Sequence, residues 1–299
     1  MVVPVLDGAG QIGTCVSRLR GQTRPPDELI VVDNGSSDAT AAVAAGAGAK
    51  VVGQPVRGVY RARNTGWRGS DADVIAFTDA DCEPEPDWLE KLVEPFSDPT
   101  VAGVGGEAPL AEVRTAAQRW VVLRGFMSQE RNYAHGFLPF FATANAAYRR
   151  SALETVGGFE ERFWSGGDTD LSWRVQAFGA GRLVLRPEAR VIHRFAEDWT
   201  EVTSRSRRYA GGHALLDVRW SAWPAYRATR GTFLQRTRGV WLLPGRLPYR
   251  LVRGTDVSIP LIDAAVRASY EIGLAEGRRR ARLLDLEPLP APAPAAGIR

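Results

Sequence analysis

Asp79 and Asp81 are two carboxylates separated by one residue, at the end of the apolar run Val74–Thr78. A buried strand that releases such a D-x-D pair at its carboxyl end places oxygen ligands at the rim of a sheet, where open α/β sheets bind ligands. Hard cations such as Mg²⁺ and Mn²⁺ combine carboxylates with phosphate oxygens. The segment therefore indicates a metal–diphosphate site, although the same residues are compatible with a solvated turn.

A second pattern that could bind a nucleotide lies near the N-terminus. Residues 8–13 read G-A-G-Q-I-G, and Asp33 follows Gly13 by twenty residues, which is the spacing of a dinucleotide fingerprint. Two residues disfavour that interpretation: Pro4 has no amide hydrogen for a central strand, and the Asp7 carboxylate would repel a pyrophosphate. On the residues alone, an NAD-dependent oxidoreductase that uses Gly8–Gly13 stays an alternative.

The elements that must position these residues alternate along the first hundred positions. Strand-like runs and helical spacing follow one another as strand Val2–Leu6, helix Gln11–Arg20, strand Leu29–Val32, helix Ala39–Gly46, strand Lys50–Gly53, helix Val59–Trp67 and strand Val74–Thr78. Strands that alternate with helices predict a mainly parallel sheet flanked by crossover helices. From Glu201 onward the pattern is helical, and a Pro/Ala-rich tail is expected to be disordered.

The composition is that of an ordinary soluble protein, with 299 residues, 44% hydrophobic and 24% charged. The chain has no run of eighteen apolar residues and no pattern of a secretory signal. Its two cysteines, Cys15 and Cys82, provide neither a disulfide framework nor a cysteine-based zinc site. We therefore expect a cytoplasmic protein.

Charge is distributed unevenly along the chain. From residue 201 onward there are 17 Arg against 8 Asp and Glu, and since the whole chain carries +4, residues 1–200 carry about −5. Aromatic residues are interleaved with the arginines over residues 205–255, which predicts peripheral contact with an anionic membrane at the inner face. A solvated arginine-rich surface is the alternative. We expect no nucleic-acid partner, because no recognised motif accompanies the charge.

Further segments follow in a definite order around the D-x-D strand. They read VVDNGSSD (31–38), RARNTG (61–66), TANAAYRR (143–150), VGGFE (156–160), GGDTDLSWR (166–174) and VIH (191–193). Together this ordered set resembles the family-2 glycosyltransferases, inverting enzymes with the A-type, nucleotide-diphospho-sugar-binding fold. The likeness spans about residues 2–195, and the ordered set is far more specific than any single motif.

On the donor side, the resemblance implies roles for residues at the strand ends and in the A-R-N segment: Pro4, Asp7, Asp33, Arg63, Asn64 and Asp79. Asp33 would accept a hydrogen bond from the nucleotide base, although the same geometry suits a ribose hydroxyl. Arg63 suits a diphosphate, because a planar guanidinium binds phosphate through two parallel hydrogen bonds.

The resemblance also implies a metal site for Mn²⁺ or Mg²⁺, comprising Asp79, Asp81 and His193, with Asp81 as the expected direct ligand. Neutral imidazole readily binds Mn²⁺, but a single histidine after a strand is equally compatible with packing. A metal at this position would neutralise the charge that develops on the departing nucleoside diphosphate.

An inverting transfer also needs a base that takes the proton from the acceptor hydroxyl. The family places it in a G-E-D-x-D-L segment, which here reads G-G-D-T-D-L, so the resemblance implies Asp168 as the base and Gly167 as a departure from the usual acid. Asp170 is an alternative base, although it suits N-terminal helix capping. The residues expected on the acceptor side are Asn145, Asp170, Trp173 and Arg174.

These observations predict an α/β protein with the A-type glycosyltransferase fold and a helical C-terminal extension. Residues 1–110 would bind the nucleotide sugar, residues 111–200 the acceptor, residues 201–287 would form the basic extension and residues 288–299 the tail. The expected reaction is metal-dependent, inverting transfer of a sugar from a nucleotide diphosphate donor, UDP-linked, to a hydroxyl of a glycan, a lipid-linked carrier or a small metabolite. Because of Gly167, a non-catalytic sugar-nucleotide or carrier-binding module stays a second alternative.

Overall fold

The computed structural model describes residues 1–193, 198–230 and 257–291. The chain divides into two compact units, one formed by Met1–Val113 with Arg124–Phe195 and the other by Arg114–Leu123 with Ala196–Arg299. All the motifs that suggest chemistry belong to the first unit. Each unit is described by itself.

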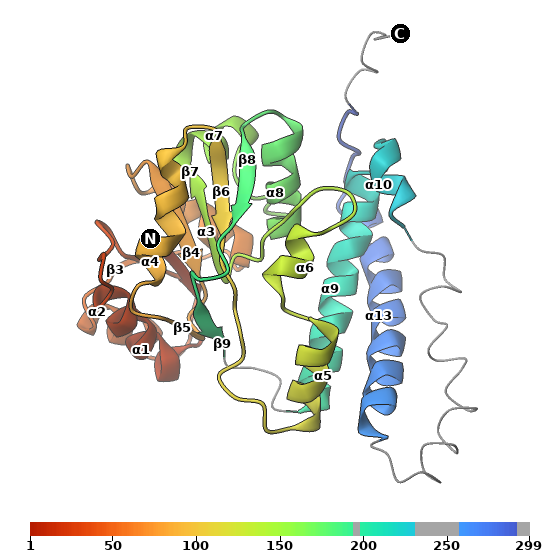
Figure 1. The fold of residues 1–299 in the computed structure, drawn as a ribbon, viewed down its shortest axis with the longest axis horizontal. Helices are drawn as coiled ribbons and strands as arrows, with labels where there is room; N and C mark the ends of the chain where they lie inside the picture. The colour runs from red at the N-terminus through yellow and green to blue at the C-terminus, as the bar shows by residue number, and fades with distance from the viewer. Residues whose placement is uncertain (194–197, 231–256, 292–299) are drawn as a thin grey trace. The chain divides into compact units, whose positions relative to one another are not determined.

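A seven-stranded sheet forms the centre of the first unit (Figure 1), with the strand order β3-β2-β1-β4-β7-β6-β8. The strands are β1 (Val2–Val5), β2 (Ile30–Asp33), β3 (Lys50–Gly53), β4 (Val74–Thr78), β6 (Val101–Gly105), β7 (Asn145–Arg149) and β8 (Arg182–Leu185). Only β7 runs antiparallel to its neighbours, β4 and β6, among these strands. The prediction of a mainly parallel sheet is therefore confirmed.

Helices cover both faces of this sheet. One face packs against α1 (Ala9–Arg20), α2 (Thr40–Gly46) and α4 (Trp88–Val93), whose apolar side chains share a core with alternate residues of the strands. The other face receives α3 (Val59–Arg68) and α8 (Gly167–Ala177), and α7 (Arg150–Val156) packs against α8. Two short helices, η1 (Glu94–Ser97) and α6 (Gln129–Tyr133), lie in the connections. Alternation along each strand thus buries both faces, as a parallel sheet requires.

Pro4 lies in the middle of the sheet, a place that its missing amide hydrogen disfavours. The carbonyls of Met1 and Val5 accept hydrogen bonds from the amides of Ile30 and Asn34 at 2.9 and 2.8 Å. The odd-numbered residues of β1 therefore bond toward β2, and the backbone of Pro4 faces β4. On that side, Val2 with Phe77 is the single residue pair that joins β1 to β4. The hydrogen-bond ladder between these two strands therefore ends before Pro4, where the amide hydrogen is missing.

The position of this interrupted ladder matters for ligand binding. From β1 the chain builds β2 and β3 on one side, whereas β4 and its successors lie on the other side. The strand order therefore reverses between β1 and β4, and open α/β sheets bind ligands outside the carboxyl ends of the strands at such a point. Pro4 keeps the two strand ends from pairing there.

A buried amide network ties α3 to the turn that follows α7. The Asn64 side chain donates to the Phe159 carbonyl and to Glu161, and its oxygen accepts from the Phe159 amide and from Trp67 Nε1, all at 2.9 Å. The turn itself contains Gly157 and Gly158, with φ of 77° and 75°. A Cβ on Gly158 would lie 2.6 Å from Asn64 Oδ1, whereas a Cβ on Gly157 would meet no atom within 4 Å.

The second unit is helical where it is described. It contains α9 (Trp199–Arg219), α10 (Pro224–Ala228) and α13 (Ser258–Leu283), together with most of α5 (Ala116–Arg124). Helices α9 and α13 approach closely, since a Cβ on Gly273 would lie 2.0 Å from the Arg207 carbonyl oxygen. This confirms the predicted helical C-terminal extension. Among the described helices, none combines the length and the apolar character that crossing a lipid bilayer requires.

Among the described aromatic residues of the predicted membrane-contact segment, Tyr209 and Trp223 are half-buried. Trp220 and Tyr226 are buried in the second unit, where the Tyr226 hydroxyl bonds to Asp217, so these two rings contribute to its core. Residues 231–256, which hold about half of the predicted membrane-contact segment, lie outside the described residues, as do residues 292–299 of the predicted tail.

The two glycines after α7 provide a matched pair for a stability test. Both adopt the left-handed conformation, so replacement of either by alanine should cost about 1–2 kcal/mol of backbone strain. We expect Gly158→Ala to cost about 2 kcal/mol more than Gly157→Ala, because its Cβ would also displace Asn64. Urea unfolding of both variants measures the difference. Equal losses would show that the Asn64 network does not constrain this turn.

Candidate functional site

The two carboxylates of the D-x-D segment point to different partners. Asp79 Oδ1 pairs with Arg63 Nη2 at 2.6 Å, and Arg63 is 5% exposed. Asp81 Oδ2 lies 3.7 Å from His193 Nε2 instead. The segment thus connects an arginine of α3 with a histidine from more than a hundred residues farther along the chain.

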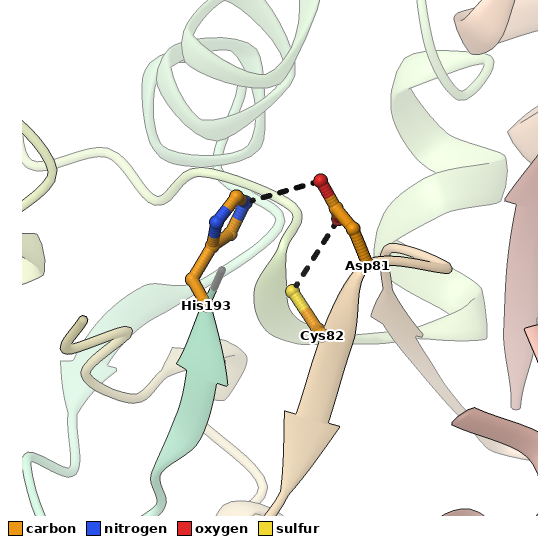
Figure 2. Close-up of side chains that lie close together, drawn as sticks. All are labelled: Asp81, Cys82 and His193. Atoms are coloured by element: carbon orange, nitrogen blue, oxygen red, sulfur yellow. Dashed lines mark hydrogen bonds and ion pairs between the residues drawn. The ribbon is translucent and has the colours of Figure 1, made fainter. Parts of the chain in front are cut away.

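A two-stranded ribbon outside the main sheet brings His193 to this position. Strand β5 (Cys82–Pro84) pairs antiparallel with β9 (Val191–His193), and Cys82 stands opposite His193 in the register. Figure 2 shows the Asp81 carboxylate, the Cys82 thiol and the His193 ring converging from the ends of these strands. One ligand atom from each of the three residues lies within 4.8 Å of the others.

Asp81 and His193 fit a divalent cation. A carboxylate oxygen and an imidazole nitrogen 3.7 Å apart can both bind one ion at metal–ligand distances of about 2.0–2.2 Å. The set of oxygen and nitrogen donors suits Mn²⁺ as well as other divalent ions. Cys82 is the weaker candidate, because burial and the charges of Asp79 and Asp81 raise the pKa of its thiol and favour the protonated form.

Asp79 is excluded from the group of ligand atoms that the described residues form. Its carboxylate is held by Arg63, so the predicted metal role of Asp79 stays a prediction, and the geometry favours Asp81 as the direct ligand. The buried guanidinium of Arg63 retains capacity for a ligand. Its Nε is buried without a hydrogen-bond partner among the described residues, so this nitrogen could donate to a bound ligand.

Asp168 lies in the first turn of α8, where its Oδ1 accepts the Thr169 amide at 3.0 Å. Burial raises the pKa of this carboxyl, and the nearby positive charge of Arg63 partly offsets the effect. A carboxylate with a raised pKa accepts a proton from a hydroxyl more readily. Asp168 is therefore chemically suited to the predicted role of base, and Arg63 connects it electrostatically to Asp79.

The other predicted donor residues lie at the carboxyl ends of β1 and β2. Asp33 ends β2 and accepts the Ser36 amide at 3.1 Å. Asp7, whose φ is 49°, accepts hydrogen bonds from the amide and hydroxyl of Ser37 at 2.7 and 3.0 Å. These contacts fix the two loops that border the interrupted β1–β4 edge. The loops are in place to contact a nucleotide, and that contact stays a prediction.

The G-x-G-x-x-G segment begins α1, but its amides are occupied within the protein. The Gly8 amide donates to Thr40 Oγ1 at 2.8 Å, and the Ala9 amide donates to Asp38 Oδ2 at 3.2 Å. A carboxylate thus occupies the helix N-terminus at which a dinucleotide would place its pyrophosphate. The geometry disfavours the dinucleotide alternative.

The four residues predicted on the acceptor side are all buried and bonded inside the protein. Asp170 forms an ion pair with Arg174 at 2.7 Å, and Arg174 also donates to the carbonyls of Val156 and Gly158. Arg174 thereby holds the turn after α7. The predicted capping role of Asp170 is wrong in detail, because its carboxylate binds this arginine one turn later in α8.

Asn145 and Trp173 also have structural partners. The Asn145 amide donates to the carbonyls of Glu107 and Ala189, both at 2.8 Å, and its oxygen accepts from Trp88 Nε1. Trp173 Nε1 donates to the Leu138 carbonyl at 2.8 Å. These bonds indicate that both side chains stabilise the backbone segments around the site. Direct contact with an acceptor stays a prediction for all four residues.

Solved structures with the same fold identify the class of protein. A mannosyltransferase from Pyrobaculum calidifontis, in complex with GDP-Man and Mn²⁺, is 20% identical, with a TM-score of 0.60 over 95% of this chain and 86% of that chain. Glucosyl-3-phosphoglycerate synthase from Mycobacterium tuberculosis, in complex with Mn²⁺, UDP and phosphoglyceric acid, is 21% identical, with a TM-score of 0.51 over 71% and 75% of the two chains. The chain has the A-type glycosyltransferase fold, as the sequence predicted.

The particular family follows from sequence comparison. The model described as glycosyl transferase family 2 matches residues 1–157, more than half of the chain, and the chain belongs to this family. It is 34% identical over 228 residues to the pre-mycofactocin glycosyltransferase of Mycobacterium tuberculosis and 33% identical over 195 residues to glycosyltransferase AglE of Haloferax volcanii. These matches cover 73% and 60% of this chain but 47% and 61% of the relatives, so the chain spans about half of their length.

Two residues near the site were missed by sequence reasoning. Cys82 directly follows Asp81, and only its pairing with a distant histidine reveals that it borders the metal ligands. Tyr60 stands three residues before Arg63, and its hydroxyl lies 3.4 Å from Asp168 Oδ1. The signal that could have indicated Tyr60 is Gly167, because the loss of a side chain beside the base leaves space for another residue.

The raised pKa of Asp168 predicts that its ionised form destabilises the folded state. This penalty is present above the raised pKa and is lost as the pH falls through that pKa toward the ordinary value of 3.8. We therefore expect Asp168→Asn to be more stable than wild type at pH 7–8, and the difference to shrink as the pH falls. Thermal unfolding from pH 8 down to about pH 4 measures it, with Asp71→Asn, at a fully exposed carboxylate, as the control. A variant less stable than wild type at pH 8 would contradict the assignment.

Proposed function

We propose that this chain catalyses the metal-dependent, inverting transfer of a sugar from a nucleotide diphosphate donor, UDP-linked, to an acceptor hydroxyl. The observation that carries the proposal is the set of groups beside the interrupted β1–β4 edge. They are a carboxylate–imidazole pair, Asp81 with His193, a buried guanidinium, Arg63, and a carboxyl with a raised pKa, Asp168. Each group has the chemistry for one part of such a transfer.

Four residues would bind the donor and its metal ion. At the end of β2, Asp33 would accept a hydrogen bond from a base N–H, as a uracil provides. Arg63 would bind the diphosphate, whose negative charge compensates the buried guanidinium. Asp81 and His193 would hold Mn²⁺ or Mg²⁺, and a bound cation neutralises charge on the departing diphosphate. The relatives of the same fold that bind Mn²⁺ with GDP-Man or UDP support this assignment.

The transfer step assigns one proton to Asp168. The acceptor oxygen forms a bond to the anomeric carbon on the face opposite the diphosphate, and the bond from that carbon to the diphosphate oxygen breaks. The proton of the acceptor hydroxyl passes to the Asp168 carboxylate. Burial favours this step because it raises the proton affinity of the carboxylate, while Arg63 keeps enough positive potential nearby for the ionised form to exist before the reaction.

The acceptor belongs to one of three classes: a glycan, a lipid-linked carrier or a small metabolite. Relatives that carry such names include a glucosyl-dolichyl phosphate glucuronosyltransferase of Haloferax volcanii, 28% identical over 165 residues, and the synthase bound to phosphoglyceric acid. We further propose a cytoplasmic location, with peripheral contact of the basic second unit with the inner face of the membrane. The surplus of arginine from residue 201 onward supports this part of the proposal.

Nucleotide binding distinguishes this proposal from the oxidoreductase alternative. UDP with Mn²⁺ should raise the melting temperature, since a ligand at a hundredfold its dissociation constant stabilises a protein by about 2.7 kcal/mol, whereas NAD should have no effect. Asp81→Asn should abolish the part of the shift that depends on Mn²⁺. Glu83→Gln, which neutralises a carboxylate two residues later that pairs with Arg18 at 3.8 Å, should retain it. Stabilisation by NAD in place of UDP would overturn the proposal.

Replacement of Asp168 should impair the transfer step and leave donor binding unchanged. With a donor and acceptor identified in a screen of UDP- and GDP-sugars, Asp168→Asn should lower kcat by about 10²–10⁴-fold, because the variant lacks the base. The dissociation constant of UDP in the presence of Mn²⁺ should stay within twofold of the wild-type value. Asp71→Asn should transfer sugar at the wild-type rate. A fully active Asp168→Asn variant would assign the base to another residue.

A further inference from the structure

Tyr60 reaches from the first turn of α3 to the first turn of α8. Its ring is 4% exposed and stacks on Phe159, with ring centroids 5.6 Å apart and an interplanar angle of 18°. The turn that carries Phe159 is itself fixed by the Asn64 amide. The ring is therefore held from one side, and its hydroxyl extends to within 3.4 Å of Asp168 Oδ1.

Gly167 also borders the Tyr60 ring. A Cβ at this position would lie 2.7–2.8 Å from three carbons of the Tyr60 ring. Real Cβ atoms do not approach so closely, and Phe159 prevents the ring from retreating. The tyrosine thus fills the volume that a side chain beside Asp168 would occupy. Gly167, the departure from the family pattern, and Tyr60 are two parts of one arrangement.

We propose that Tyr60 is a positioning residue for Asp168, whose hydroxyl donates a hydrogen bond to Oδ1 and directs Oδ2 toward the acceptor hydroxyl. This inference rests on the proposed function of Asp168 as the base. The Thr169 amide already donates to Oδ1 at 3.0 Å, so both donors engage the same oxygen. Two donors on one oxygen fix the rotation of the carboxylate and leave the second oxygen to a substrate.

The hydroxyl–carboxylate distance of 3.4 Å is longer than an ordinary O–H···O bond of about 2.5–3.0 Å. Bonds of catalytic groups are often long without substrate and shorten when the substrate binds. A small rotation of the Asp168 side chain would suffice here, because the Tyr60 ring is confined by Phe159 and Gly167.

The charged surroundings of Asp168 determine what loss of the hydroxyl should do. Arg63 of α3 lowers the pKa of this carboxyl, and Asp79 after β4 raises it. Tyr148 of β7 is the other titratable group nearby, and its hydroxyl bonds to Ser172 Oγ at 2.7 Å. A hydrogen bond from Tyr60 favours the ionised carboxylate, so its removal should shift the titration of Asp168 to higher pH.

Tyr60→Phe tests the hydroxyl alone, because it preserves the ring that packs against Phe159 and Gly167. With UDP-glucose or GDP-mannose, Mn²⁺ and the acceptor found by screening, we expect kcat to fall about tenfold and the KM of the donor to stay within twofold. The acidic limb of the pH profile should move to higher pH. Tyr148→Phe, which removes another buried hydroxyl that contacts α8, is the matched control and should leave that limb unchanged.

A second measurement needs no turnover. In ligand-free protein with ¹³C-labelled aspartate, the Asp168 carboxyl signal is assigned as the one lost in Asp168→Asn, and its titration midpoint should rise in Tyr60→Phe and stay at the wild-type value in Tyr148→Phe. An unchanged midpoint together with an unchanged kcat would overturn the positioning role. Failure of wild type to bind UDP with Mn²⁺ or to transfer any sugar would overturn the proposed function instead, while the titration would still decide the contact between Tyr60 and Asp168.

Discussion

The ion pair of the buried Arg63 with the partly exposed Asp79 is the interaction on which the rest of the site depends. A guanidinium that is 5% exposed needs compensating negative charge, and Asp79 provides it at 2.6 Å. The same positive charge moderates the pKa of Asp168. Without Arg63, two carboxylates would face each other across a site that is suited to bind an anionic diphosphate. One arginine therefore permits acids and a polyanion to occupy the same edge of the sheet.

Helix α3 supplies this arginine together with most of the framework around it. Its residues Tyr60, Arg63, Asn64 and Trp67 recur at helical spacing and are all buried. Tyr60 contacts Asp168, Arg63 contacts the D-x-D segment, and Asn64 contacts the turn after α7 and accepts a hydrogen bond from Trp67. Gly66 lets this helix approach β1, since a Cβ there would lie 2.3 Å from Val2 Cγ1. A single helix face thus sets the distances between groups that come from four different segments.

The parts of the fold that could be predicted are those with local signals. Strands β3 and β4 match their predicted bounds, because a short apolar run and the residues that end a strand are neighbours in sequence. The pairing of Cys82 with His193 had no such signal, since the two residues are far apart and their strands have three residues each. Likewise, the ion pair of Asp170 with Arg174 is at ordinary helical spacing, and only its burial distinguishes it from a solvent-exposed pair.

The G-x-G-x-x-G segment shows why spacing alone does not define a nucleotide site. The segment does begin a helix after a strand, and Asp33 does end the next strand, as the fingerprint requires. The decisive residue lies outside the pattern: the Asp38 carboxylate accepts the Ala9 amide at the N-terminus of α1. A helix N-terminus satisfied by a fixed carboxylate repels a pyrophosphate that the same dipole would otherwise attract. We therefore place the proposed diphosphate beside Arg63, beyond β1, where the strand order reverses.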